Sequence, residues 1–157
     1  QITAVEMDFE NYKLAEANTK NYPNVQLMQK AVWTEEKIVY YDGQDTQSFS
    51  VNNTLSSGFP VESISINSIL KKVPGVMIDY LKMDIEGAEY ALLLENSETS
   101  WLRNIKYISV EVHNTQKYNS ETGVSRIIEM LTKNNFSAFK SSLHWSSVFA
   151  ANKELIK

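Results

Sequence analysis

Apolar and polar positions alternate along the chain between the two-residue period of strands and the longer period of helices. Short apolar or β-branched runs predict strands, and apolar residues three and four positions apart predict amphipathic helices. The predicted strands cover residues 2–6, 25–28, 76–83 and 105–112. The predicted helices cover residues 9–20 with Asp8 as N-cap, 66–72, 87–95, and a segment capped by Ser120.

Two pairs of shorter runs predict β-hairpins. The first joins residues 37–41 to 47–51 around the Asp-Gly dipeptide at 42–43, which is typical of tight turns. The second joins residues 136–140 to 145–150 and closes the chain.

Strand–helix alternation followed by a closing hairpin predicts an open α/β sheet, mostly parallel. No repeat, low-complexity tract or linker divides the sequence, so residues 1–157 are expected to form a single domain. In such sheets, ligands bind at the carboxyl ends of the strands. We therefore expect the functional side chains there.

Composition changes this picture mainly by what it excludes. The 157 residues carry 15 basic and 19 acidic side chains, a net charge of −4, which disfavours a nucleic-acid partner. The sequence has no cysteine, which excludes thiolate metal sites and cysteine nucleophiles. It shows neither a signal peptide nor an apolar run of membrane-spanning length, so we expect a cytoplasmic protein with no membrane contact. Oligomeric state is left open.

The first predicted strand ends in Glu6. A carboxylate in this place of a nucleotide-binding α/β fold can accept hydrogen bonds from both hydroxyls of a ribose, because its two oxygens match the diol spacing. The alternative is an acid in a solvated turn. We take Glu6 as a candidate cofactor-binding residue.

A group of acidic residues follows the strand at 76–83. Asp84 could cap the next helix, and Glu86 and Glu89 could complement its dipole. However, Lys82, Asp84 and Glu86 also fall on alternate positions, on one side of a strand expected to be buried. Because buried charge needs a partner or a purpose, a functional site is favoured here.

The strand at 105–112 ends beside a histidine. Glu111 and His113 share one face by the two-residue period, and we expect them near Asp84 because consecutive strands are commonly neighbours. The titration range of imidazole suits proton abstraction from a hydroxyl. Glu111 could orient the imidazole, or two carboxylates with His113 could hold a hard divalent cation. We assign no metal.

Several stretches, in this order, resemble the FkbM-type S-adenosylmethionine-dependent methyltransferases. The most specific is 81–89, Leu-Lys-Met-Asp-Ile-Glu-Gly-Ala-Glu, and the run from 107 to 113 follows at a familiar distance. Val5-Glu6, Lys30-Ala31-Val32 and Ser56-Ser57-Gly58 accompany them. The resemblance implies a Rossmann-like class I methyltransferase fold, a three-layer sandwich whose mostly parallel sheet ends in an antiparallel C-terminal hairpin.

The resemblance also implies methyl transfer from S-adenosylmethionine to a hydroxyl of a sugar, a polyketide or a similar small molecule. Carried over by position, Glu6 binds the cofactor ribose, Ala31 lies beside the adenine, and Asp84 also borders the cofactor. The residues implied at the methyl-transfer site are Asp84, Glu86, Glu111 and His113. His113 is the first candidate for the general base, and Asp84 is the second.

One part of the family pattern is absent. Class I methyltransferases begin with a strand and a Gly-rich turn, whereas this sequence has no Gly-x-Gly and starts at what resembles the second strand. We expect roughly 30 residues of such a unit upstream of Gln1, or another chain in its place. The alternative function is a degenerate methyltransferase-fold module that binds other proteins without catalysis.

Two further segments have possible roles, the loop at 46–60 and the turn of the closing hairpin. The polar loop at 46–60 is a candidate lid or acceptor contact, or else a plain surface loop. His144 and Trp145, at the turn of the closing hairpin, are expected at the far side of the sheet in a structural role.

Overall fold

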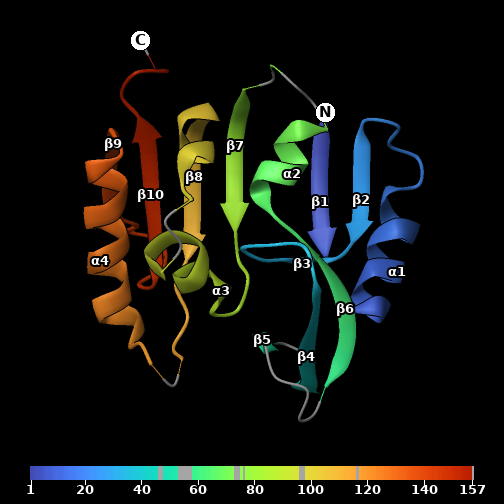
Figure 1. Cartoon of the computed structure of the whole chain (residues 1–157). Helices are drawn as coiled ribbons and strands as arrows, with labels where there is room; N and C mark the ends of the chain where they lie inside the picture. Colours follow the sequence, from blue (N-terminus) through green and yellow to red (C-terminus); the bar gives the residue numbers. More distant parts are fainter. Residues whose placement is uncertain are drawn as a thin grey trace. The chain divides into compact units, whose positions relative to one another are not determined.

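The computed structural model describes residues 1–45, 48–52, 58–72, 75, 77–95, 98–115 and 117–156, with the backbone alone for 42–45 and 48–52. The chain divides into two compact units, Gln1–Ile66 and Asn67–Lys157, whose elements are labelled in Figure 1. Each unit is described by itself. That both units form a single domain stays a prediction.

The first unit opens with a strand–helix–strand motif. β1 (Ile2–Glu6) and β2 (Val25–Gln29) pair in parallel, and α1 (Phe9–Thr19) connects them. Asp8 caps α1 as predicted, because its Oδ1 accepts the backbone N–H of Asn11 at 2.9 Å. The three elements lie within one residue of their predicted bounds.

The second sheet of this unit has the order β3-β6-β4-β5, with β3 (Ala31–Val32), β4 (Ile38–Asp45), β5 (Ser48–Asn52) and β6 (Phe59–Ile64). β3 and β6 are parallel, whereas β4 runs antiparallel to both neighbours. The predicted hairpin is present as β4 and β5, but its turn is not at 42–43, because β4 continues to Asp45 with a register shift between Asp42 and Asp45.

The second unit contains a four-stranded sheet of order β7-β8-β10-β9. Its strands are β7 (Ile78–Met83), β8 (Ile105–Glu111), β9 (Phe136–Lys140) and β10 (Ser147–Asn152). β7 and β8 are parallel, and β10 runs antiparallel to both β8 and β9, so the predicted closing hairpin is present (Figure 1).

The helices of this unit are α2 (Ile66–Lys71), which starts at the boundary, α3 (Ala88–Tyr90) and α4 (Ser120–Lys133). α3 continues as the π-helical turn η1 (Ala91–Glu95), and the 3₁₀ helix η2 (Ser100–Asn104) precedes β8. α4 packs on β9 and β10 through its apolar stripe, which buries Val124, Ile127 and Leu131. Its N-cap is Asn119 rather than the predicted Ser120, which is buried inside the helix.

The sheets are mixed, so the predicted mostly parallel sheet is not confirmed. Among the strand pairs of the described residues, β1–β2, β3–β6 and β7–β8 are parallel and the other four are antiparallel. The fold is therefore a mixed α/β structure. No helix in the described part of the chain is long and apolar enough to span a bilayer.

Candidate functional site

The carboxyl ends of β7 and β8 lie side by side in the second unit. Their parallel register pairs Lys82 with Ser109 and Met83 with Val110, so both strands end at the same level. Asp84 and Glu86 leave the end of β7, while Glu111 and His113 lie at the end of β8. The structure thus brings together the four residues predicted for methyl transfer.

The turn from β7 into α3 has an unusual backbone. Glu86 has a φ of +51° and Gly87 a φ of +100°, two successive left-handed residues. A Cβ on Gly87 would lie 2.8 Å from Cγ2 of Thr115, so this place requires glycine on both grounds. A left-handed Glu86 costs on the order of 1–2 kcal/mol, and such strain concentrates at functional sites.

One imidazole nitrogen faces three carboxylates. Nε2 of His113 lies 3.6 Å from Oδ1 of Asp84, 3.5 Å from Oε2 of Glu86 and 3.9 Å from Oε1 of Glu111. The His113 side chain is 20% exposed, and the three acids are partly exposed. An open cluster of this kind can accept a proton at Nε2 and stabilise positive charge beside it.

The other nitrogen faces a fourth carboxylate, which is buried. Oε1 of Glu89 lies 3.4 Å from Nδ1 of His113 and accepts the backbone N–H of His113 at 2.7 Å. Oε2 of Glu89 accepts the N–H of Gly87 at 2.8 Å. The Glu89 side chain is 0% exposed, and its place in the first turn of α3 fits the alternative that it complements the helix dipole. The spacing of Asp84 and Glu86 in the sequence predicted a site here, but it did not indicate that Glu89 is the buried acid.

These contacts shift two titrations. The Glu89 carboxylate beside Nδ1 raises the pKa of His113 above its usual value, against the opposing effect of burial, and Glu86 and Glu111 add to the rise. Burial raises the pKa of the Glu86 carboxyl, partly offset by attraction to His113. Because both pKa values are raised, His113 and Glu86 are each a stronger base here than in water.

Tyr90 of α3 holds the backbone of His113. Its hydroxyl donates to the carbonyl oxygen of His113 at 2.8 Å, and burial raises the pKa of Tyr90 to about 12, so it remains a donor. The ring stacks on Tyr118 with centroids 4.4 Å apart. α3 thus anchors the end of β8 through Glu89 and Tyr90.

The turn of the closing hairpin lies at this same end of the sheet. Ser147 pairs with Glu111, and Nδ1 of His144 lies 3.9 Å from Oε1 of Glu111. The predicted far-side position of His144 and Trp145 is therefore wrong, because β10 is antiparallel to β8 and starts where β8 ends. Leu143 is 96% and Trp145 58% exposed here.

The prediction that Lys82 belongs to a buried group is wrong. Its side chain is 62% exposed, and its Nζ donates to Oδ2 of Asp84 at 3.0 Å. That hydrogen bond raises the pKa of Lys82, which remains a cation. The expectation of buried charge is therefore wrong for Lys82, and Asp84 and Glu86 are only partly buried.

Glu6 and Ala31 belong to the first unit. Oε1 of Glu6 accepts the N–H of Asp8 at 2.8 Å, and burial raises the pKa of the Glu6 carboxyl. Ala31 is buried in β3, opposite Ser63. Their positions around a cofactor stay a prediction, and residues 46–47 and 53–57 of the candidate lid at 46–60 lie outside the described residues.

The cluster could also hold a metal ion. Asp84, Glu86 and His113 each offer one ligand atom, and the three atoms lie within 4.8 Å of one another. Carboxylate oxygens and an imidazole nitrogen are ordinary ligands of divalent cations.

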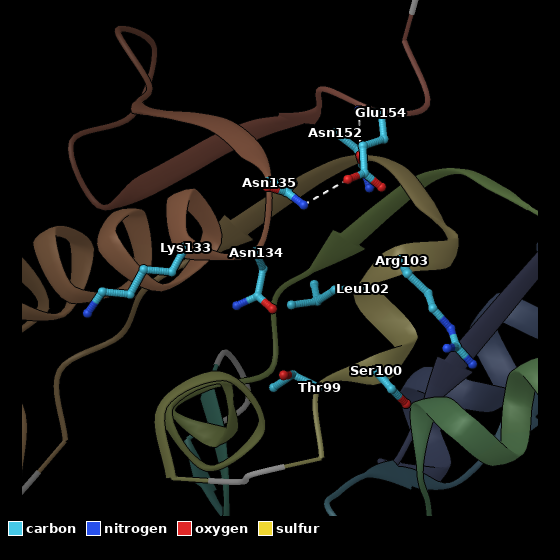
Figure 2. A pocket seen from close by; sticks show the side chains of 9 residues that line it. All are labelled: Thr99, Ser100, Leu102, Arg103, Lys133, Asn134, Asn135, Asn152 and Glu154. Atoms are coloured by element: carbon cyan, nitrogen blue, oxygen red, sulfur yellow. Dashed lines mark hydrogen bonds between the residues drawn. The ribbon is translucent and has the colours of Figure 1, made fainter.

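A separate hollow, shown in Figure 2, lies at the other end of the strands from the acidic cluster. Its volume is about 280 Å³, and it lies near the start of β8 and the end of β10. The residues that line it are Thr99, Ser100, Leu102, Arg103, Lys133, Asn134, Asn135, Asn152 and Glu154. None of them is a predicted site residue, so the strand-end cluster remains the candidate site.

Comparison with known families identifies the class of the domain. A family model described as the Methyltransferase FkbM domain matches residues 5–138, a range that includes Asp84, Glu86, Glu111 and His113. The mixed α/β fold is consistent with this methyltransferase domain. The chain belongs to the FkbM methyltransferase family. Searches of curated proteins and of solved structures give no match.

Proposed function

We propose that the protein transfers a methyl group from S-adenosylmethionine to a hydroxyl of a small molecule. The observation that carries the proposal is the imidazole of His113, whose Nε2 faces three carboxylates at two strand ends inside a methyltransferase domain. Acid–base groups at the carboxyl ends of neighbouring parallel strands are where α/β folds place their chemistry.

The residues present fit this cofactor. The Glu6 carboxylate is oriented by the backbone N–H of Asp8 at the end of β1, as a group that binds a ribose diol must be. Asp84, Glu86 and Glu111 provide negative charge that favours a sulfonium. Ala31 is assigned to the adenine. When bound, S-adenosylmethionine supplies an activated methyl group, so the protein needs no covalent intermediate.

The protein's own task is to align the acceptor and remove its proton. Nε2 of His113 takes the proton of the acceptor hydroxyl, and the imidazolium that forms is stabilised by the carboxylates around it. Asp84 is the second candidate base, although its ion pair with Lys82 makes it less available.

The acceptor class is a sugar, a polyketide or a similar molecule. Two exposed apolar side chains, Leu143 and Trp145, lie on the hairpin turn whose His144 approaches Glu111. An aromatic ring and an aliphatic side chain beside polar groups suit an acceptor that has both an apolar face and hydroxyls.

The direct test is a transfer assay with radiolabelled S-adenosylmethionine and a panel of monosaccharides, glycosides and polyketide alcohols. We expect label in at least one product, and binding of S-adenosylhomocysteine by calorimetry. If the folded protein neither binds S-adenosylhomocysteine nor labels an acceptor, the module without catalysis replaces the enzyme.

A further inference from the structure

Glu89 is the only charged side chain that is fully buried among the described residues. Its two oxygens accept the backbone N–H groups of Gly87 and His113. In the described part of the chain, no lysine or arginine lies within ion-pair distance of it, and the basic group that it faces is Nδ1 of His113. Removing a carboxylate from water is costly, so this contact must offset part of the cost.

The contact fixes where the imidazole carries its proton. Nδ1 is buried and has no hydrogen bond of good geometry within the described residues, while Oε1 of Glu89 lies 3.4 Å away. A lone pair on Nδ1 would face a fully buried carboxylate oxygen and be repelled, whereas an N–H would be attracted. The carboxylates that face Nε2 act more weakly on it, because they are 25–35% exposed and Asp84 is paired with Lys82. Catalytic hydrogen bonds are often long before substrate binds and shorten afterwards.

We propose that Glu89 is a positioning residue that keeps a proton on Nδ1 of His113 and thereby leaves the lone pair on Nε2. Nε2 is the nitrogen that points to Asp84, Glu86 and Glu111, where an acceptor would lie. In the transfer step, the O–H bond of the acceptor breaks and an N–H bond forms at Nε2. The catalytic consequence rests on the proposed function, but the position of the proton does not.

The surroundings of the ring explain why a three-residue helix is enough for this role. Glu89 binds the N–H of His113 and Tyr90 binds its carbonyl oxygen, so two successive residues of α3 hold both backbone groups. The backbone of His113 is therefore fixed, and only rotation about the side-chain bonds can change the direction of the ring. Glu89 then selects the orientation in which Nδ1 points inward.

The first test uses the whole wild-type chain with ¹⁵N-labelled histidine. The sequence has only two histidines, so two imidazole systems appear in a long-range ¹H–¹⁵N correlation spectrum, and His144→Gln assigns them. At a pH where His113 is neutral, we expect Nδ1 to carry the proton. A neutral His113 with its proton on Nε2 would overturn the proposal, whether or not any variant folds.

The second test compares two substitutions that remove one charge each. Glu89→Gln is expected to mix the two neutral forms of His113 and to lower kcat about 10- to 100-fold, as loss of an orienting group does. Glu86→Gln, which changes a carboxylate on the Nε2 side, should leave the proton on Nδ1. An unchanged spectrum in Glu89→Gln would contradict the proposal.

The two tests separate this inference from the proposed function. If Nδ1 carries the proton and no methyl transfer is found, the proposed function fails and the assignment of Glu89 stands. If methyl transfer is found and Nε2 carries the proton, the enzyme stands and the assignment of Glu89 fails.

Discussion

The imidazole of His113 is where the contacts of the site converge. Four carboxylates surround it, three on the Nε2 side and Glu89 on the Nδ1 side. The sequence could predict His113 and the three acids, because each follows an apolar strand at a two-residue spacing. It could not predict the burial of Glu89, because that depends on the turn at Glu86 and Gly87, whose left-handed backbone no periodicity shows.

The pH dependence of catalysis follows from this residue. A general base must be neutral, and Glu89 raises the pKa of His113 above the ordinary value of 6.5. We expect kcat/KM to fall with decreasing pH, with a midpoint above 6.5, in a pH–rate profile of methyl transfer. A midpoint clearly below 6.5 would contradict the role of Glu89.

The same shift predicts how His113 affects stability. Because its folded-state pKa is raised, protonated His113 stabilises the fold below its unfolded-state pKa, and this stabilisation is lost as pH rises through the folded-state pKa. Urea unfolding should therefore show His113→Gln to be more damaging at pH 5.5 than at pH 9. An equal loss at both pH values would argue against the shift.

At the scale of elements, the outcome depends on where the periodic pattern is strong. β1, β8 and α4 were predicted within a few residues because their apolar positions are regular. β6 was missed, since Pro60 and Glu62 interrupt its apolar positions, yet Pro60 pairs with Tyr40 in the sheet. The helix predicted at 87–95 is α3 followed by a π-helical turn, a change that packing decides.

The packing of α4 on Tyr90 gives a prediction at this scale. A Cβ on Gly123 would lie 2.3 Å from the Tyr90 hydroxyl oxygen and 2.7 Å from its ring, so the hydroxyl that holds His113 would have to move. We expect Gly123→Ala to destabilise the fold by about 1–3 kcal/mol despite its better helix propensity. Chemical denaturation measures this.

Thr122→Ala is the matched control, because this neighbour is exposed on the same helix. It should change the free energy of unfolding by less than about 0.5 kcal/mol. Equal stability of Gly123→Ala and Thr122→Ala would show that Tyr90 and α4 are not in the described contact.

At the scale of the whole molecule, the family match spans residues in both units. The strand-end cluster lies in the second unit, while Glu6 and Ala31, assigned to the cofactor, lie in the first. The proposed function therefore assigns residues from both units. The sequence alone could supply this assignment only through its resemblance to the family, because a net charge of −4 and an ordinary composition exclude partners but name none.

Metal removal tests how the whole site works. Although Asp84, Glu86 and His113 could hold a divalent cation, the proposed mechanism gives the proton to His113 and requires no metal. Turnover should therefore be unchanged after treatment with EDTA. A loss of activity that Mg²⁺ restores would show that the cluster binds a catalytic cation instead.

The most direct measurement is kcat for methyl transfer by His113→Ala, with Glu129→Gln on the exposed face of α4 as control. We expect kcat to fall by about 10²–10⁴-fold in His113→Ala, the range for loss of a general base, with binding of S-adenosylhomocysteine retained. Glu129→Gln should match the wild type. A folded His113→Ala that turns over within about twofold of the wild type would contradict the assignment of the site.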